Sequence, residues 1–532
     1  MNFFGIIFLF SCRTDTILDD TSDLKDISET EIPSSPNATE QLRLELLQRG
    51  MEHLQNLSEI STAHENRAAG SLGYDETVMY LISQGQEYGY NVDVQDFMFY
   101  LYHLLATPEF EENAGETTGN SYETSAFWYS PAGNGDALIS SVDLQLPPSN
   151  QANSSTSGCE IEDFDDFPSG HIALIQRGSC TFTQKAQLAE QAGAVAVVIF
   201  NEGQLGRQDI VEGFLDANSV QIPVFGMSFE DGQALSTKSD VLFFYNLQSE
   251  IRDITSQNVF FQPPSLDESY IMLGGHADSV FAGGGLNDNG SGIAAILSIA
   301  KQNANQDLPI RYAFWGGEEL GLLGSYHFIS DAYPETLQNI SSYINLDMIA
   351  SPNFARMIYD GDGSLSNMRG PNHSDEIEAM FEAHFDEQNL HHQPTPFDGR
   401  SDYGPFIDVG IAAGGLFTGA EGMKTEAEEA MYGGDAGKPY DECYHEACDD
   451  ILNINDEVFG DMILATFSVL NDLVDNNLPQ YTSVNDFPSQ IRIPQSKCHH
   501  TEEEEKEDNV DEEEKEEGKN TTEERIRFLS VK

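Results

Sequence analysis

The chain has 532 residues, of which 90 are Asp or Glu and 25 are Lys or Arg, so its formal net charge is −65. Hydrophobic residues make up 39% and include 32 Phe and 20 Tyr, which is enough for a large core and argues against a chain that is disordered throughout. The acidic balance also argues against nucleic acid as a partner, because phosphates require a cationic surface. The length fits two domains with additional tails.

The first residues, MNFFGIIFLFSC, form a short apolar run without the basic start of a standard signal peptide. The run is too short to cross a bilayer as a helix, and no other stretch reaches that length. Its last four residues, which end at Cys12, weakly resemble a bacterial lipoprotein cleavage box, and a cleaved signal peptide explains the run equally well. We expect a leader and an acidic linker over 1–40 and a secreted protein. A vacuolar or lysosomal lumen, or a lipid anchor at Cys12, are the alternatives.

The spacing of the cysteines bears on the redox compartment. Cys443 and Cys448 bracket YHEA, which suits a small disulfide loop, and Cys159 and Cys180 flank another compact segment. Asn-x-Ser/Thr sequons recur along the chain and are candidate glycosylation sites. Together with the leader, these features favour an oxidising compartment and predict two disulfides.

The folded part begins with apolar residues at helical spacing shortly after residue 40, followed by a second helix, a turn and a strand. From about 105 to 250, the β-like runs HIALIQRG, AVAVVIFN and QIPVFGMS surround one helical segment, TFTQKAQLAEQAGA, which indicates a compact α+β insert. After 251, strand-like and helix-like segments alternate, which is typical of a mostly parallel sheet flanked by helices. The acidic run that begins near 498 is typical of a disordered tail.

Ionisable residues stand at the ends of three predicted strands and in one Gly-rich loop. They are His276 and Asp278 after YIMLGG, Glu318 and Glu319 after IRYAFWGG, Asp347 after SSYINL, and Asp288 in AGGGLNDNGSG. Because the carboxyl ends of parallel strands meet at one edge of a sheet, we expect these side chains to face one crevice. Carboxylates at such close range repel one another unless cations compensate them, so the pattern favours a bound metal pair.

Each element alone has a simpler interpretation. A His-x-Asp pair commonly lies on the surface, a Gly-Gly-Glu-Glu run is commonly a solvated helix start, and a Gly-rich stretch can be only a flexible loop. The joint placement of nitrogen and oxygen ligands at strand ends and in one loop is what favours the metal site.

Six segments resemble, in order, the motifs of the co-catalytic dinuclear zinc aminopeptidases. They are LGGHADSV…GGGLNDNGSG, RYAFWGGEELGLLGS, INLDMIASPN, GRSDYGPF, AGGLFTGAEG and DECYHEACDD. The resemblance covers about 41–128 and 250–475 and extends in particular to secreted bacterial leucine aminopeptidases. The insert resembles a protease-associated (PA) domain.

This resemblance implies an α/β, three-layer zinc exopeptidase fold with a mostly parallel, helix-flanked sheet. The expected divisions are the leader and linker over 1–40, the peptidase domain over 41–128 and 250–478, the α+β PA insert over 129–249, and the acidic tail over 479–532.

The family pattern also implies two Zn²⁺ ions per chain, held by five positions of this sequence. His276 and Asp347 would hold one ion, Glu319 and His445 the other, and Asp288 would bridge both.

Other positions match residues with supporting or chemical roles in the family. Glu318 would be the general base that takes a proton from the water between the ions. Asp278 is placed to accept the second ring N–H of His276, and Tyr444 resembles the tyrosine that assists the oxyanion. We also consider a supporting role near His445 for one of two neighbouring residues, Ser401 and Asp402.

Met348, Arg400 and Phe417 match positions that line the family's pocket for the N-terminal side chain of the substrate. An apolar pocket favours Leu, Phe or Met at that position. Gly460 stands where the family has a calcium-binding Asp, so the resemblance does not extend to a calcium site.

The resemblance thus predicts an aminopeptidase that acts on peptides with a free N-terminus, with the PA insert binding substrate or a partner protein. Two alternatives remain open. A glutamate-releasing carboxypeptidase shares the metal set but needs several arginines for substrate carboxylates, and this chain has few. An inactive receptor with a peptidase fold is expected to have lost metal ligands, and this chain retains all five and the base.

Overall fold

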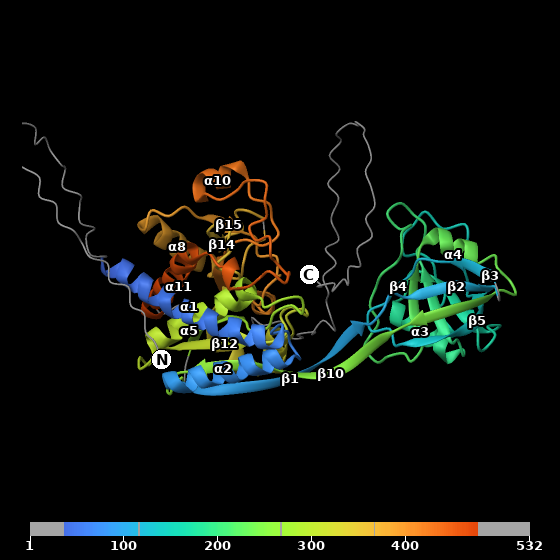
Figure 1. The fold of residues 1–532 in the computed structure, drawn as a ribbon, viewed down its shortest axis with the longest axis horizontal. Coiled ribbons are helices and arrows are strands. Elements are labelled where there is room, and N and C mark those ends of the chain that lie inside the picture. Colours follow the sequence, from blue (N-terminus) through green and yellow to red (C-terminus); the bar gives the residue numbers. More distant parts are fainter. Residues whose placement is uncertain (1–36, 115–116, 267–268, 367, 477–532) are drawn as a thin grey trace, which may run out of the picture.

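The computed structural model describes residues 37–114, 117–266, 269–366 and 368–476. The predicted leader with Cys12 and the predicted acidic tail lie outside the described residues. The described part forms two lobes, each built on an eight-stranded sheet, and a long two-stranded ribbon connects them (Figure 1). We call them the first lobe and the second lobe.

The sheet of the first lobe is mostly parallel. Its strands, in spatial order, are β1 (Asn91–Leu104), β10 (Ser249–Gln262), β12 (Ile310–Trp315), β11 (Tyr270–His276), β13 (Ile340–Leu346), β16 (Ala413–Phe417), β14 (Met357–Tyr359) and β15 (Gln393–Thr395). The strands β12, β11, β13 and β16 are parallel, whereas β10 is antiparallel to β12 and β14 is antiparallel to β16. The predicted mostly parallel sheet is therefore confirmed.

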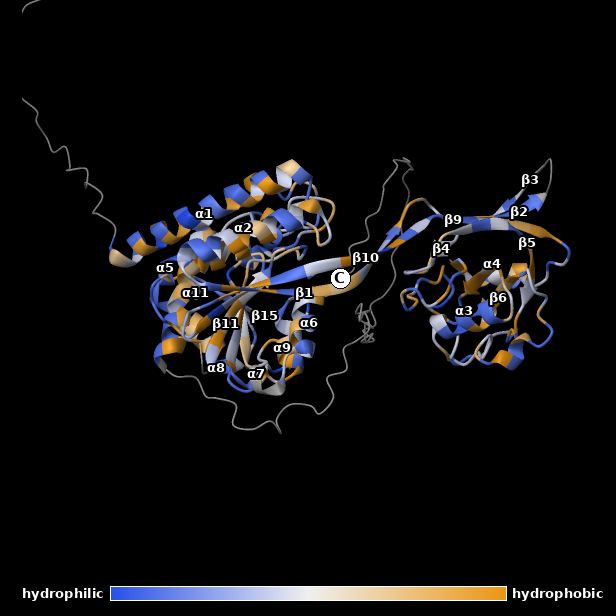
Figure 2. Cartoon of the chain, turned by 90° about the horizontal axis from the view of Figure 1, so that it is seen from below, coloured by the Kyte–Doolittle hydropathy of each residue, from blue (hydrophilic) through white to orange (hydrophobic). Residues whose placement is uncertain are grey.

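Helices cover both faces of this sheet and complete the expected three layers (Figure 2). One face packs against α1 (Ala38–His64), α2 (Leu72–Tyr88), α5 (Gly292–Asn303), α8 (Ser374–Glu387) and α11 (Asp456–Asn476). The other face packs against α6 (Leu323–Asp331), α7 (Pro334–Gln338) and α9 (Tyr403–Asp408). The lobe also contains α10 (Glu426–Tyr432) and the helical turns η2 (Leu286–Ser291) and η3 (Ile451–Asn453).

Gly274, which has no side chain, allows the core to pack tightly beneath the end of β11. A Cβ atom at Gly274 would lie 2.7 Å from the Tyr343 hydroxyl and 2.8 Å from the Trp315 ring nitrogen. These two groups are hydrogen bonded, with the Trp315 N–H donating to the Tyr343 oxygen at 2.8 Å. The Tyr343 ring in turn stacks on Phe406 of α9, with centroids 4.0 Å apart. This packing supports the strand that ends at His276.

The second lobe is the compact α+β insert predicted from the sequence. Its strands, in spatial order, are β3 (Thr117–Ser121), β2 (Glu109–Ala114), β9 (Leu242–Leu247), β5 (Gly133–Ser141), β6 (Ile172–Gln176), β7 (Ala196–Phe200), β8 (Val224–Met227) and β4 (Ser125–Ala126). The lobe also contains α3 (Phe182–Gln191), α4 (Phe229–Leu235) and the turn η1 (Ile161–Phe164). Because β2 pairs with β9, this sheet begins ahead of the boundary that we predict at 129.

Both predicted disulfides are present, one between Cys159 and Cys180 and the other between Cys443 and Cys448. The first ties the segment before β6 to the start of α3, and the second closes the loop that contains His445. Within the described residues, every helix is too short or too polar to cross a membrane.

The ribbon consists of β1 and β10, which pair in antiparallel fashion from Asn91 opposite Gln262 to Leu104 opposite Ser249. On its other edge, β10 pairs with β12 only from Val259 to Phe261. The rest of the ribbon continues as two strands to the second lobe (Figures 1 and 2).

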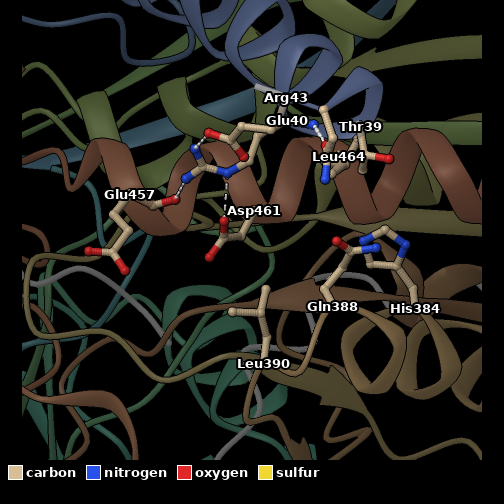
Figure 3. A pocket seen from close by; sticks show the side chains of 10 residues that line it. Thr39, Glu40, Arg43, His384, Gln388, Leu390, Glu457, Asp461 and Leu464 are labelled. Atoms are coloured by element: carbon tan, nitrogen blue, oxygen red, sulfur yellow. Dashed lines mark hydrogen bonds and ion pairs between the residues drawn. The ribbon is translucent and has the colours of Figure 1, made fainter. Parts of the chain in front are cut away.

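A buried ion-pair network joins α1 to α11 in the first lobe. Arg43 of α1 donates to the Asp461 carboxylate at 2.7 Å, and Arg356 donates to the same carboxylate at 2.5 Å. Figure 3 shows Arg43 and Asp461 at a pocket where these helices approach the end of α8. Asp461 is only 7% exposed, so these two guanidinium groups compensate the cost of burying its carboxylate.

We expect Asp461→Ala to lower the free energy of unfolding by about 3–5 kcal/mol, because it leaves two largely buried guanidinium groups without their carboxylate. Urea unfolding followed by circular dichroism measures this loss. The matched control is Glu457→Ala on the same helix, where only the backbone carbonyl contacts Arg43. The control should change stability by no more than about 0.5 kcal/mol, and an equally small effect of Asp461→Ala would contradict the prediction.

Candidate metal centre

Three parallel strands bring predicted site residues to one edge of the first sheet. The strand β11 ends at His276, β12 is followed by Glu318 and Glu319, and β13 is followed by Asp347. All four residues are at least 95% buried. Because β11 lies between β12 and β13, the carboxyl ends of the three strands meet.

Two loops complete the cluster. Asp288 belongs to η2, in the Gly-rich stretch between β11 and α5, and is 2% exposed. His445 is held in the small loop closed by the Cys443–Cys448 disulfide, with a φ of 59°. The structure therefore brings together all five positions at which we expect zinc ligands.

The distances divide the cluster into two groups that share Asp288. The His276 Nε2 atom lies 3.2 Å from Asp288 Oδ1 and 3.3 Å from Asp347 Oδ1. The His445 Nε2 atom lies 3.1 Å from Asp288 Oδ2 and 3.1 Å from Glu319 Oε2. One oxygen of Asp288 thus faces each imidazole.

The carboxylates make this edge strongly attractive to cations. Burial alone would lower the pKa of His276, but Glu318 and Asp347 outweigh burial and hold that pKa well above its ordinary value. At His445, burial is likewise outweighed by Asp288 and Glu319, which raise its pKa to about 10. The same negative field favours a divalent cation in place of the protons.

The chemistry and spacing of the donors fit zinc. Imidazole nitrogen and carboxylate oxygen are normal zinc ligands, with metal–donor distances near 2.0–2.2 Å. Two donors on one tetrahedral zinc ion therefore lie about 3.3 Å apart. The separations of 3.1–3.3 Å within each group match that value.

The two adjacent glutamates occupy different parts of the cluster. Glu319 faces His445, whereas the Glu318 Oε2 atom lies 3.9 Å from His276 Nε2. The turn before them requires Gly317, whose φ is 71°. Successive side chains therefore diverge, and Glu318 stands beside the first group without belonging to it.

Asp278 contacts the site through both its backbone carbonyl and its carboxylate. His276 Nδ1 lies 3.1 Å from the Asp278 backbone oxygen and 3.7 Å from its carboxylate. The carboxylate accepts hydrogen bonds from the backbone N–H groups of Glu318 and Glu319, at 3.1 and 3.4 Å. It therefore orients the turn that carries both glutamates, while its backbone carbonyl faces the imidazole.

Two buried residues that we did not predict hold the loops of the site. The Asp449 carboxylate accepts the backbone N–H groups of Asn287 and Asp288, at 2.8 and 3.0 Å, and burial raises its pKa to about 7. Arg67 is fully buried and donates to the carbonyls of Ala277, Gly284 and Gly285. Asp449 lies four residues after His445, and this proximity to a candidate ligand could have indicated a role at the site. The sequence around Arg67 contains no such indication.

The residues considered as supports for His445 lie near another ligand. Ser401 donates to Asp347 Oδ2 at 2.6 Å and accepts from Asn345 at 2.8 Å. Asp402 is fully buried, and burial raises its pKa to about 7. Ser401 therefore positions Asp347, because β13 and the segment before α9 are adjacent.

The remaining predicted residues surround the cluster. The Tyr444 ring stacks on His445 with centroids 3.8 Å apart. Met348 directly follows Asp347 and is 2% exposed, and Phe417 at the end of β16 is half-buried. Arg400 is exposed and pairs with Glu421 at 3.0 Å.

Two family models match the chain. The model described as Peptidase family M28 matches residues 258–469, and the model described as PA domain matches residues 143–235. The first match includes all five candidate ligands and Glu318, and the second lies within the second lobe.

The chain is also similar to curated aminopeptidases over most of its length. An aminopeptidase of Pseudomonas aeruginosa strain UCBPP-PA14 is 42% identical over 427 residues, which cover 76% of this chain and 77% of that protein. Leucine aminopeptidase 2 of Trichophyton equinum is 39% identical over 425 residues, which cover 78% and 81% respectively.

Solved structures of aminopeptidases share the fold. The aminopeptidase from Aneurinibacillus sp. strain AM-1 aligns with a TM-score of 0.56 and 22% identity, covering 82% of this chain and 96% of that one. A zinc aminopeptidase from Bacillus subtilis aligns with a TM-score of 0.50 and 23% identity, covering 84% and 98%. The chain belongs to peptidase family M28, as a metallo-aminopeptidase with an inserted PA domain.

Proposed function

We propose that this metallo-aminopeptidase removes the N-terminal residue from peptides with a free α-amine and prefers large apolar residues such as Leu. The observation that carries the proposal is the pair of imidazoles that share one buried carboxylate, Asp288, with Glu318 beside them. The similarity to an enzyme called leucine aminopeptidase 2 supports the preference.

In this proposal His276 and Asp347 would hold one zinc ion, Glu319 and His445 would hold the other, and Asp288 would contribute a carboxylate oxygen on the side of each imidazole. When bound, the two ions supply Lewis-acid activation of the scissile carbonyl and of water at neutral pH. The chain's contribution is to hold its donors in a buried volume, where electrostatic interactions are stronger than in water.

Glu318 is our candidate for the general base. Its carboxylate takes a proton from the attacking water and delivers it to the leaving amine. The support for this role is geometric, because Glu318 is buried beside the first group of ligands and the Asp278 carboxylate accepts its backbone N–H. That hydrogen bond restrains the turn and so orients the Glu318 carboxylate.

Three roles concern the substrate. The Tyr444 hydroxyl donates a hydrogen bond to the oxygen that develops negative charge, and the ring's stacking on His445 supports a position near the centre. The carboxylates of Glu318 and Asp347, with nearby carbonyls, attract the free α-ammonium group. Met348 and Phe417 form the apolar wall of the pocket for the N-terminal side chain, with Arg400 at its rim.

The division into a peptidase domain over 41–128 and 250–478 and a PA insert over 129–249 is likewise a proposal, made from the family resemblance, and the strands β2, β3 and β4 of the second lobe precede its boundary at 129. We also propose that the protein is secreted, because its two disulfides require an oxidising compartment to persist. The PA insert is proposed to bind substrate or a partner protein.

A glutamate-releasing carboxypeptidase is less well supported. That reaction needs cationic side chains free to bind substrate carboxylates. Arg67 beside the site is buried and donates to three backbone carbonyls, and Arg400 pairs with Glu421. Neither is therefore available as a carboxylate clamp.

The function is tested with three substrates on the purified full-length protein: Leu-p-nitroanilide, its N-acetylated form, and a peptide ending in Glu. We expect hydrolysis of the free-amine substrate alone, its loss with a zinc chelator, and recovery when zinc is restored. Cleavage of the blocked or Glu-terminated substrate without cleavage of the free amine would rule out an aminopeptidase.

For the base, we expect Glu318→Gln to retain two zinc ions but to lower kcat by about 10²–10⁴-fold, because the amide cannot accept the proton. Elemental analysis and steady-state kinetics measure the two quantities. The control is Glu421→Gln at the exposed rim, which should keep most of kcat. Turnover of Glu318→Gln near the wild-type rate would refute the assignment.

For the shared ligand, we expect Asp288→Ala to lower the zinc content of both sites together, because one oxygen of Asp288 faces each imidazole. Zinc per protein, measured after equilibration with a weak chelator, reports this loss. Ser401→Ala is the comparison, because Asp347 is the only one of the five proposed ligands that loses a hydrogen bond in this variant. Two ions retained in Asp288→Ala would count against the shared role.

A further inference from the structure

The direction of the strands places the candidate metal centre at the edge of the first sheet from which the ribbon leaves. The strand β10 runs from the second lobe into the first, and β12 is antiparallel to it. Since β11 and β13 are parallel to β12, their carboxyl ends all point back toward the second lobe. A peptide that leaves the metal centre in the direction of β12 therefore extends beside the ribbon.

One edge of β10 is open along this path. At the far end of the ribbon, the Leu105 N–H donates to the Gln248 carbonyl at 2.8 Å. Because the register with β1 is unbroken, even-numbered residues of β10 direct their backbone groups toward β1, and odd-numbered residues direct theirs away from it.

The contacts of Gln257 confirm that odd-numbered residues of β10 direct their backbone groups away from β1. Its carbonyl accepts the Tyr74 hydroxyl at 2.6 Å and lies 2.8 Å from where a Cβ atom of Gly316 would stand. Gly316 directly follows β12 and comes two residues before Glu318, so the outward edge of β10 faces the end of β12. The open edge therefore begins beside the candidate base.

Beyond Gln257, three residues present outward backbone groups: Thr255, Asp253 and Ile251. Thr255 and Asp253 are exposed, and Ile251 is half-buried. Within the part of the chain that the structure describes, the only strand pairing on this side of β10 is with β12, over Val259–Phe261. Such an edge is a template for another extended chain.

We propose that the open edge of β10, from Ile251 to Gln257, is an extended binding site for the peptide substrate. The inference rests on the proposed aminopeptidase function. The substrate's first residue lies at the metal centre, and the following residues pair with β10 as an antiparallel strand directed toward the second lobe. The seven residues of β10 from Ile251 to Gln257 are separated by six steps of about 3.3 Å and so span about 20 Å, which accommodates a peptide of about six residues.

The charge of the chain narrows the substrate class. Asp253 lies exposed on this edge, and the whole chain has a net charge of −65. Acidic peptides are therefore repelled, whereas neutral and basic extended peptides are favoured.

The test compares Thr255→Pro with Thr255→Ala. Proline removes the outward N–H without breaking the pairing with β1, and such positions tolerate proline. Alanine keeps the N–H and changes the side chain alone. Leu-p-nitroanilide, a Leu dipeptide and an unstructured hexapeptide that begins with Leu are the substrates.

In the wild type, the hexapeptide should exceed the dipeptide in kcat/KM by about tenfold, as expected for two added backbone hydrogen bonds. Thr255→Pro should remove most of this excess, whereas Thr255→Ala should keep it. Both variants should hydrolyse Leu-p-nitroanilide at the wild-type rate. Equal values for the two peptides in the wild type, or a hexapeptide excess that Thr255→Pro leaves intact, would overturn the proposal.

A second measurement uses only the unmodified enzyme and so does not depend on the folding of a variant. Hexapeptides N-methylated at successive residues should alternate between low and high kcat/KM, because every second N–H faces β10. Absence of alternation overturns the edge site. A dimer in sedimentation that Thr255→Pro dissociates also overturns it, because a second copy then occupies the edge. Failure to cleave Leu-p-nitroanilide would instead refute the proposed function itself.

Discussion

The central constraint on this structure is that several carboxylates lie close together at one buried edge of a sheet, where their mutual repulsion must be compensated. Asp288, Glu318, Glu319 and Asp347 lie almost wholly buried around two imidazoles. Such a group is stable only when positive charge lies among its members, and the proposed zinc ions would supply that charge in place of protons. The family membership of the chain and the spacing of the donors agree on this point.

Much of the surrounding structure serves to hold these donors in place. Asp449 and Arg67 bind backbone groups of the Gly-rich loop from two sides, and Asp278 binds the turn after β12. None of these contacts adds a ligand. They tie the loops to the sheet and so oppose the like-charge repulsion among the ligands.

The ribbon gives the second lobe a defined place relative to the chemistry. Because β10 enters the first sheet antiparallel to β12, the strand ends that carry the metal centre point toward the lobe that matches the PA domain. One insertion therefore provides both a separate α+β lobe and a strand edge beside the site. The arrangement explains how a domain distant in sequence from the ligands comes to lie on the path of an extended substrate.

Local pattern in the sequence was enough to predict the alternating strands and helices, the positions of His276, Glu318 and Asp347 at strand ends, and both disulfides. Strand polarity determines where strand-end side chains gather, so these residues could be grouped without coordinates. His445 was found only through family resemblance, since no strand places it. The tertiary structure alone decided the roles of Asp449, Arg67 and Ser401, the two contacts of Asp278, and the open edge of β10. These features arise from contacts between segments far apart in the chain, which local spacing does not encode.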